Sequence, residues 1–169
     1  MIPKIPEKSK RFFENTGSIR FLYSRQDHLN GEDTSGPSSW GAGAIMKAID
    51  EGFAGLVALD SQYRVLGFSP KFPVSYHKQI RYVTGYEKSG ALVDVRYQRS
   101  EEGLLYLLNA PSEEIRAHIL LPKNVTVAKI LVNGQEINAT VSQVYDSTYV
   151  DFNYKKVSGA QLKIEIFLS

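Results

Sequence analysis

The chain has 169 residues, 43% of them hydrophobic and 11% aromatic, which is enough apolar content for a packed core and excludes a disordered chain. The 20 Lys and Arg residues nearly balance the 18 Asp and Glu residues. The net charge of +2 argues against a nucleic-acid partner, which favours clustered basic residues. The absence of cysteine excludes disulfides, thiolate metal sites and cysteine nucleophiles.

Residues 1–37 are polar and end in the turn-forming run 30–37 (NGEDTSGP), which predicts a loop. Their apolar runs are too short for a signal peptide or a membrane span. We therefore expect no membrane partner. The chain is expected to be cytoplasmic, or else secreted or periplasmic after removal of a leader.

Metal and cofactor chemistry has no support in the sequence. His28, His77 and His118 lie far apart and show none of the short spacings of metal ligands. There is also no Gly-rich phosphate loop, no nucleophile elbow and no acidic metal-binding loop. We therefore expect neither a metal ion nor an organic cofactor.

An amphipathic helix is predicted from Trp40, because apolar residues then recur with the period of an α-helix. The stripe consists of Ala44, Ile45, Ala48, Ile49, Gly52, Phe53 and Leu56. Gly55 is a candidate for the residue that ends the helix. Because no second clear helix is predicted to cover the stripe, we expect it to pack on the rest of the chain or on a partner. That partner would be a domain missing from this chain or a second copy of the chain in a homodimer.

The rest of the chain is predicted to be β structure throughout. In residues 91–98 (ALVDVRYQ) apolar and polar side chains alternate, as in a half-buried strand. Residues 100–103 (SEEG) predict a turn, and Asn133-Gly134 predicts a tight hairpin. About eight strands at this spacing indicate an antiparallel β-sandwich or jelly roll. We therefore divide the chain into an amino-terminal loop and helix, 1–60, and a sandwich, 61–169.

Three segments around the predicted helix carry a family resemblance. They are 38–44 (SSWGAGA), 51–56 (EGFAGL) and 63–72 (YRVLGFSPKF). Their order and spacing resemble the end of the (α/α)6 catalytic barrel in glycosidases such as the α-L-rhamnosidases and their six-hairpin relatives. In that family the last barrel helix is followed by a strand that leads into a β-sandwich. Residues 79–98 are similar to the first hairpin of that sandwich.

The resemblance implies that the chain is a C-terminal accessory or structural segment of a glycoside-hydrolase-like protein acting in carbohydrate metabolism. The sandwich would cap the end of the barrel, and the helix would supply part of its wall. A complete barrel needs many more helices than this chain has, and the family's acid and base carboxylates lie mostly upstream. The catalytic residues are therefore unknown, and the chain alone is not expected to be an enzyme, although its parent would be a glycosidase.

The resemblance also implies sugar contacts, because in this family the loop before the last helix faces the sugar site. By analogy, Trp40, Glu32, Asp33 and His28 are candidates to contact a sugar. The Trp40 ring would stack on a pyranose face. The alternative is that Trp40 is the first core residue of the helix and the two acids are solvated loop residues.

Two other functions stay open. The ten tyrosines would give a free-standing carbohydrate-binding β-sandwich a platform for an oligosaccharide, although tyrosine is also an ordinary strand residue. A small independent glycosidase would use Glu32 or Asp33. It would need a pocket that holds a second carboxylate at about 5 Å for retention or about 6.5–9.5 Å for inversion.

Overall fold

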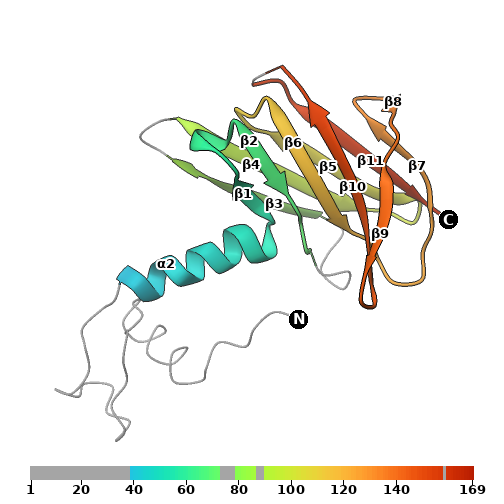
Figure 1. Cartoon of the computed structure of the whole chain (residues 1–169), viewed down its shortest axis with the longest axis horizontal. Helices are drawn as coiled ribbons and strands as arrows, with labels where there is room; N and C mark the ends of the chain where they lie inside the picture. The colour runs from blue at the N-terminus through green and yellow to red at the C-terminus, as the bar shows by residue number, and fades with distance from the viewer. Residues whose placement is uncertain (1–38, 73–78, 87–89, 158) are drawn as a thin grey trace, which may run out of the picture. The chain divides into compact units, whose positions relative to one another are not determined.

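The computed structural model describes residues 39–72, 79–86, 90–157 and 159–169 (Figure 1). The chain divides into two units, with the boundary between Ile49 and Asp50. In the first unit, the described residues form α2 (Ser39–Lys47) and the start of a π-helical turn, η1 (Ala48–Phe53). The predicted helix is thereby confirmed. No helix in the described ranges has the length and apolar character needed to cross a membrane.

The end of the helix differs from the predicted stripe in one respect. Gly55 adopts the left-handed conformation, with φ 66°, as expected of a residue that ends a helix. Leu56, the last residue of the stripe, is already the first residue of strand β1 (Leu56–Ala58). Its side chain is buried in the core of the second unit, and this burial favours the strand over another helical turn.

The second unit contains a five-stranded sheet in the order β1-β2-β6-β10-β9. Its other strands are β2 (Val65–Phe68), β6 (Glu114–Leu120), β9 (Thr140–Val144) and β10 (Ser147–Lys155). A short 3-10 turn, η2 (Ser61–Tyr63), connects β1 to β2. All neighbours are antiparallel except β2 and β6, which are parallel, with Val65 opposite Glu114 and Phe68 opposite Ala117.

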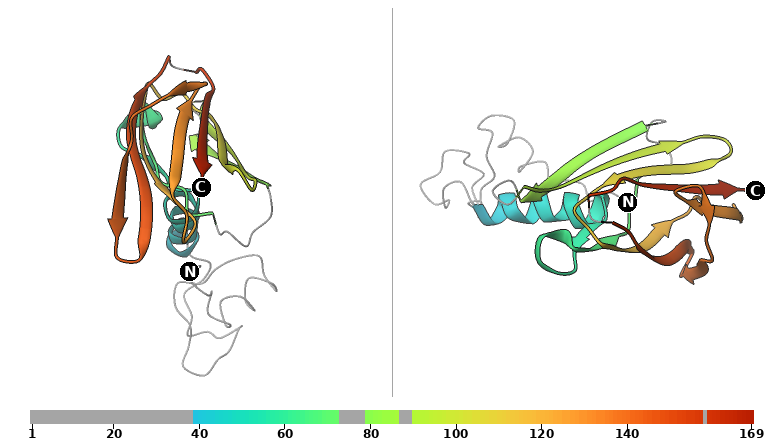
Figure 2. Two further views of the ribbon diagram at one scale, coloured as in Figure 1. Left: turned by 90° about the vertical axis from the view of Figure 1, so that its right-hand side faces the viewer. Right: turned by 90° about the horizontal axis from the view of Figure 1, so that it is seen from above.

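A six-stranded antiparallel sheet in the order β3-β4-β5-β11-β7-β8 forms the second layer (Figure 2). Its strands are β3 (Gln79–Tyr86), β4 (Ala91–Arg99), β5 (Gly103–Asn109), β7 (Val127–Val132), β8 (Gln135–Glu136) and β11 (Leu162–Leu168). The predicted β-sandwich is confirmed. Strand β1 was not among the predicted strands, because its three residues are too few to show alternation.

The core lies between the two sheets and follows the predicted alternation. Val93, Val95 and Tyr97 of β4 are buried, and the residues between them are exposed or half-buried. Each fully buried Val, Leu or Ile side chain contributes about 1.5–3 kcal/mol relative to an exposed one. Asn133 and Gly134 link β7 to β8, both with positive φ, so the predicted tight hairpin is also confirmed.

A row of aromatic rings fills one end of the core. Phe53, at the end of η1, packs edge-to-face on Phe72 at 5.2 Å between ring centroids. Phe72 contacts Tyr97, and Tyr97 contacts Tyr106, each at 5.2 Å between centroids. The Tyr82 hydroxyl donates a hydrogen bond of 2.5 Å to Asp50 Oδ1 and so ties β3 to η1. These contacts, all within the second unit, attach its first residues to strands β3, β4 and β5.

Candidate functional site

The sugar-contact candidates from the sequence are not tested by the structure. His28, Glu32 and Asp33 lie outside the described residues. Trp40 lies in the first turn of α2, but only its secondary structure is described and its side chain is not. Their role therefore stays a prediction, and the candidate sites below come from other residues.

Few of the described tyrosine side chains are placed where they could form a platform for an oligosaccharide. Tyr63, Tyr97 and Tyr106 are buried in the core, and Tyr82 and Tyr154 pack against it. Among the tyrosine side chains that the structure describes, this leaves two that face outward. Tyr145, at the tip of the β9–β10 hairpin, is 95% exposed, and Tyr149 lies on the outer face of β10. Most of the described tyrosines therefore serve the core.

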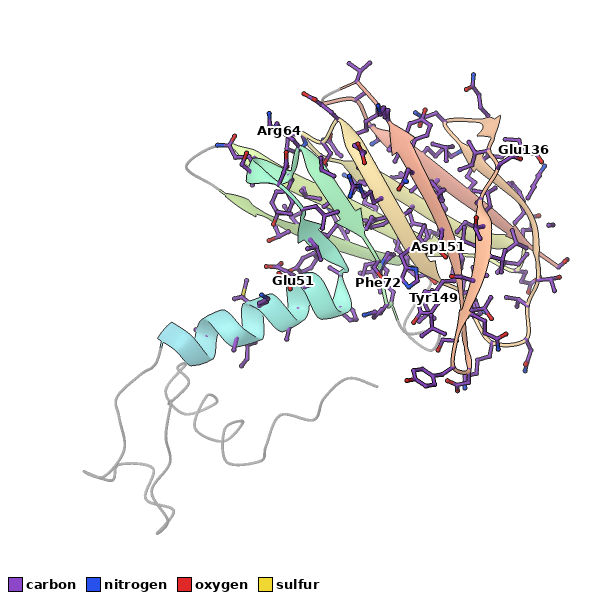
Figure 3. All side chains as sticks on the ribbon, in the orientation of Figure 1. Glu51, Arg64, Phe72, Glu136, Tyr149 and Asp151 are labelled. Atoms are coloured by element: carbon purple, nitrogen blue, oxygen red, sulfur yellow. The ribbon has the colours of Figure 1, made fainter. Side chains whose placement is uncertain are left out.

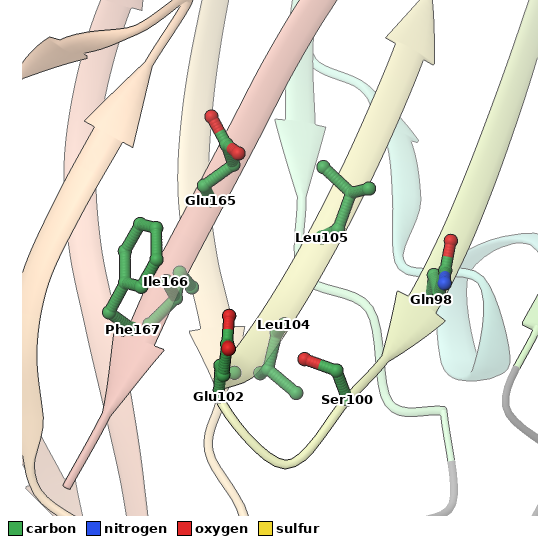
Figure 4. Close-up of a pocket in the computed structure, with 9 residues that line it drawn as sticks. Gln98, Ser100, Glu102, Leu104, Leu105, Glu165, Ile166 and Phe167 are labelled. Carbon is green, nitrogen blue, oxygen red and sulfur yellow. The ribbon is translucent and has the colours of Figure 1, made fainter.

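A groove of about 160 Å³ opens on the outer face of the six-stranded sheet (Figure 4). Its centre is a row across three strands, in which Leu105 of β5 lies between Gln98 of β4 and Glu165 of β11. The remaining side chains of the lining are Ser100, Glu102, Leu104, Ile166 and Phe167. The groove thus combines an apolar surface with two carboxylates, an amide and a hydroxyl.

The β4–β5 turn shapes one end of this groove. The predicted turn at residues 100–103 is present, and the Ser100 amide donates to the Gly103 carbonyl at 3.0 Å. Gly103 lies opposite Phe167 of β11, and a Cβ on Gly103 would stand only 1.9 Å from the Ile166 carbonyl oxygen. No other residue fits at this position, since the neighbouring strand approaches too closely.

The charged groups of the groove differ in how far they are engaged. Glu165 forms an ion pair with Lys163 on the same strand, with 2.8 Å between Lys163 Nζ and Glu165 Oε1. Lys129 Nζ lies 4.5 Å from the centroid of the Phe167 ring. In contrast, the side chains of Gln98, Ser100 and Glu102 have no hydrogen bond or ion pair to any residue that the structure describes. Their polar atoms are therefore available to a ligand.

A second polar cluster lies on the outer face of the five-stranded sheet, where Figure 3 labels Tyr149 and Asp151 of β10. The strand register places Asp151 opposite His118 of β6, and Tyr149 opposite Ser142 of β9. His118 Nδ1 lies 2.5 Å from Asp151 Oδ1, and the Ser142 hydroxyl donates to the other carboxylate oxygen. The His118 ring stacks on Tyr149 at 4.0 Å between centroids, with 10° between the planes.

The described hydrogen bonds of this cluster converge on the Asp151 carboxylate. Burial raises the pKa of Asp151, but the hydrogen bonds from Ser142 and His118 outweigh burial and leave the pKa below its ordinary value. Ser142 donates to the carboxylate and not to the imidazole, so the serine lacks the adjacent base that activates a nucleophile. The cluster instead joins the edge strand β9 to β10 and β6.

No His, Asp and Glu residues within the described ranges form a group of three or more suited to a metal ion. The groove and the cluster both escaped the sequence analysis, because each joins two consecutive strands to a third strand that is distant in sequence. The only local signal was the Ser-Glu-Glu-Gly turn, which indicated a bend and not a ligand site.

Comparisons with known proteins identify the fold. No protein-family model matches the chain, and no curated protein matches its sequence. An α-L-rhamnosidase from Streptomyces avermitilis, solved as a complex with L-rhamnose, aligns with 97% of this chain at a TM-score of 0.51 and 13% identity. The chain has the fold of one segment of that α-L-rhamnosidase. The resemblance predicted from the sequence is confirmed at the level of the fold.

The aligned segment is a small part of the rhamnosidase, since the chain spans 15% of its length. An α-L-rhamnosidase from Dictyoglumus thermophilum aligns with 68% of this chain and 12% of its own, at a TM-score of 0.44 and 17% identity. The activity of the whole Streptomyces rhamnosidase belongs to a polypeptide several times longer than the segment shared here.

Proposed function

We propose that the chain is a non-catalytic accessory segment of a glycoside-hydrolase-like protein that acts in carbohydrate metabolism. The observation that supports this proposal is the pair of coverages in the alignment with the Streptomyces rhamnosidase. Nearly all of this chain, 97%, corresponds to only 15% of that enzyme. A segment of that size in a glycosidase is expected to support a catalytic domain that lies elsewhere.

The proposed partner is a helical barrel, encoded in the same polypeptide or in a separate one. The sandwich would cap the end of the barrel, and α2 (Ser39–Lys47) would supply part of its wall. A homodimer formed through the apolar stripe of the helix is the alternative. Sedimentation distinguishes the two, because the homodimer would form with the 169-residue chain alone and at micromolar concentration.

The first experiment is to read the genome immediately upstream of Met1. An in-frame region that encodes repeated helical hairpins with paired carboxylates would support an accessory segment of a glycosidase. A stop codon and a ribosome-binding site directly before Met1, with no barrel gene nearby, would contradict it. Assays with aryl glycosides complete the test, since the chain alone should not hydrolyse them and the chain joined to its barrel should.

A second candidate function is a free-standing carbohydrate-binding module. The observation that favours it is Tyr145, an aromatic residue that is 95% exposed and has a φ of 55°, in a turn position where Asn or Gly is preferred. With Tyr149, it would form the aromatic platform. Binding to a saccharide array that is lost in Tyr145→Ala or Tyr149→Ala would support this function. Binding that survives both substitutions would exclude this platform.

A further inference from the structure

We infer that the groove on the outer face of the six-stranded sheet binds one neutral saccharide unit. This inference goes beyond the proposed accessory function, because the groove belongs to the chain itself and needs no barrel. It also uses none of the residues of the Tyr145 and Tyr149 platform. Its elements are the row Gln98, Leu105 and Glu165 and the turn residues Ser100 and Glu102.

The size of the groove limits the ligand to a single small ring. Pockets for drug-sized ligands have volumes of about 300–1,000 Å³. At about 160 Å³ this groove holds much less. It is open to solvent along the outer face of the sheet, where Leu105 and Phe167 are only half-buried, so a ring bound there can remain attached to a longer chain.

The lining of the groove has partners for both the apolar faces and the hydroxyl groups of a sugar. A sugar ring presents apolar C–H faces and a rim of hydroxyl groups. Leu105 and Phe167 offer apolar contact, while the Glu102 and Glu165 carboxylates accept hydrogen bonds from hydroxyls. Gln98 and Ser100 can both donate and accept. Glu165 is paired with Lys163, and the Lys129 ammonium lies over the Phe167 ring. The Glu102 carboxylate has no described partner and would repel the carboxylate of an acidic sugar, which makes the expected ligand neutral.

The groove is preformed, so binding would need little reorganisation. The turn that carries Ser100 and Glu102 is held by the Ser100–Gly103 backbone hydrogen bond, and the Leu168 amide donates to the Glu102 carbonyl at 3.0 Å. Leu105 lies between two paired strands. Side chains on such a rigid frame bind with a smaller entropic cost than side chains on a free loop.

The other two polar surfaces of the sandwich carry the inference less well. In the cluster around Asp151, both carboxylate oxygens are engaged by His118 and Ser142. A hollow between the ends of β2, β6 and β10 is lined by Asp60 and Arg64, and these two residues already form an ion pair of 3.2 Å. Of these three described surfaces, the groove has the most extensive apolar lining, with Leu104, Leu105, Ile166 and Phe167, whereas Val65 is the one apolar residue of the hollow.

The test is a ¹H–¹⁵N correlation NMR titration of the full chain with D-glucose, L-rhamnose and D-glucuronate. We expect at least one neutral sugar to shift the amides of residues 98–105 and 165–167, and D-glucuronate to shift them less at equal concentration. Glu102→Ala should weaken binding at least about tenfold, because hydrogen bonds to a charged group are among the strong ones. Glu136→Ala, which removes an exposed carboxylate from β8 of the same sheet, is the matched control and should leave binding unchanged.

Glu102 has no described side-chain partner, so its removal should preserve the fold, and a conserved spectrum away from the turn would verify this. Titration to about 100 mM of each neutral sugar would populate even a complex with a dissociation constant in the millimolar range. The absence of any shift at that concentration would overturn the inference. Shifts centred on Tyr145 and Tyr149 would also overturn it and would support the aromatic platform instead. Neither result bears on the accessory function, which the upstream sequence and the glycosidase assay decide separately.

Discussion

We expect the substitution Gly55→Ala, at the end of the helix, to destabilise the fold strongly. Gly134→Ala is the matched control. Both have positive φ, 66° and 78°, so Ala at either site incurs the left-handed conformation, about 1–2 kcal/mol. They differ in their surroundings. A Cβ on Gly55 would stand 1.9 Å from the Ser69 carbonyl oxygen, whereas a Cβ on Gly134 would meet nothing within 4 Å.

The additional cost at Gly55 follows from this contact. Ordinary van der Waals contact begins at 3.4 Å, so the Gly55 and Ser69 backbones would have to separate by a large part of the difference from 1.9 Å. The Ser69 amide donates to the Gly55 carbonyl at 2.7 Å, and the separation would break this bond, at about 1 kcal/mol. Displacement of the packed neighbours adds about 1–3 kcal/mol. We therefore expect Gly55→Ala to lower the free energy of unfolding by about 3–6 kcal/mol and Gly134→Ala by about 1–2 kcal/mol.

Urea denaturation followed by far-UV circular dichroism measures both values, since the sandwich contributes most of the strand signal. Thermal unfolding should give the same order, with a decrease in Tm of roughly 2–4 °C for each kcal/mol at this chain length. Equal destabilisation by the two substitutions would refute the reasoning, because the two sites would then share only their backbone conformation. The close approach of Gly55 to Ser69 would have no energetic consequence.

Three further outcomes are expected. The lowered pKa of Asp151 means that its stabilising contribution is present above about pH 4 and is lost as the pH falls through the folded-state pKa. The difference in stability between wild type and Asp151→Asn should therefore shrink between about pH 5 and pH 2 in urea melts. Burial and the hydrogen bond to Asp50 raise the pKa of Tyr82, so wild type should lose stability above about pH 10 while Tyr82→Phe loses less. Trp40 is the single tryptophan, so its predicted sugar contact can be followed by intrinsic fluorescence. The emission should change when a sugar binds, and unchanged emission on binding would remove Trp40 from the candidates.

The fold could be predicted from the sequence wherever the information was local. The alternation in β4 and the Asn133-Gly134 pair each reflect the environment of a few neighbouring residues. The parallel pairing of β2 with β6 could not be predicted in the same way, because it joins Val65 to Glu114 and no local pattern records which strands become neighbours.

The candidate sites were beyond local analysis for the same reason. The groove depends on Gln98, Leu105 and Glu165 meeting in one row across three strands. The hydrogen bond between His118 and Asp151 spans 33 residues. In sequence, each of these polar residues is one more outward position on a strand. Only the register shows that they are neighbours.

The parallel pairing of β2 with β6 also determines how late the five-stranded sheet can form while the chain is being synthesised. β2 ends at Phe68, and Ala117 is the last β6 residue that pairs with it, so 117 − 68 = 49 further residues must be added before the pairing is complete. At about 5–20 residues per second, the ribosome needs roughly 2–10 s for this interval. During that time the β1–β2 hairpin exposes an unpaired edge to other nascent chains. A chaperone that binds early in translation would have its target there.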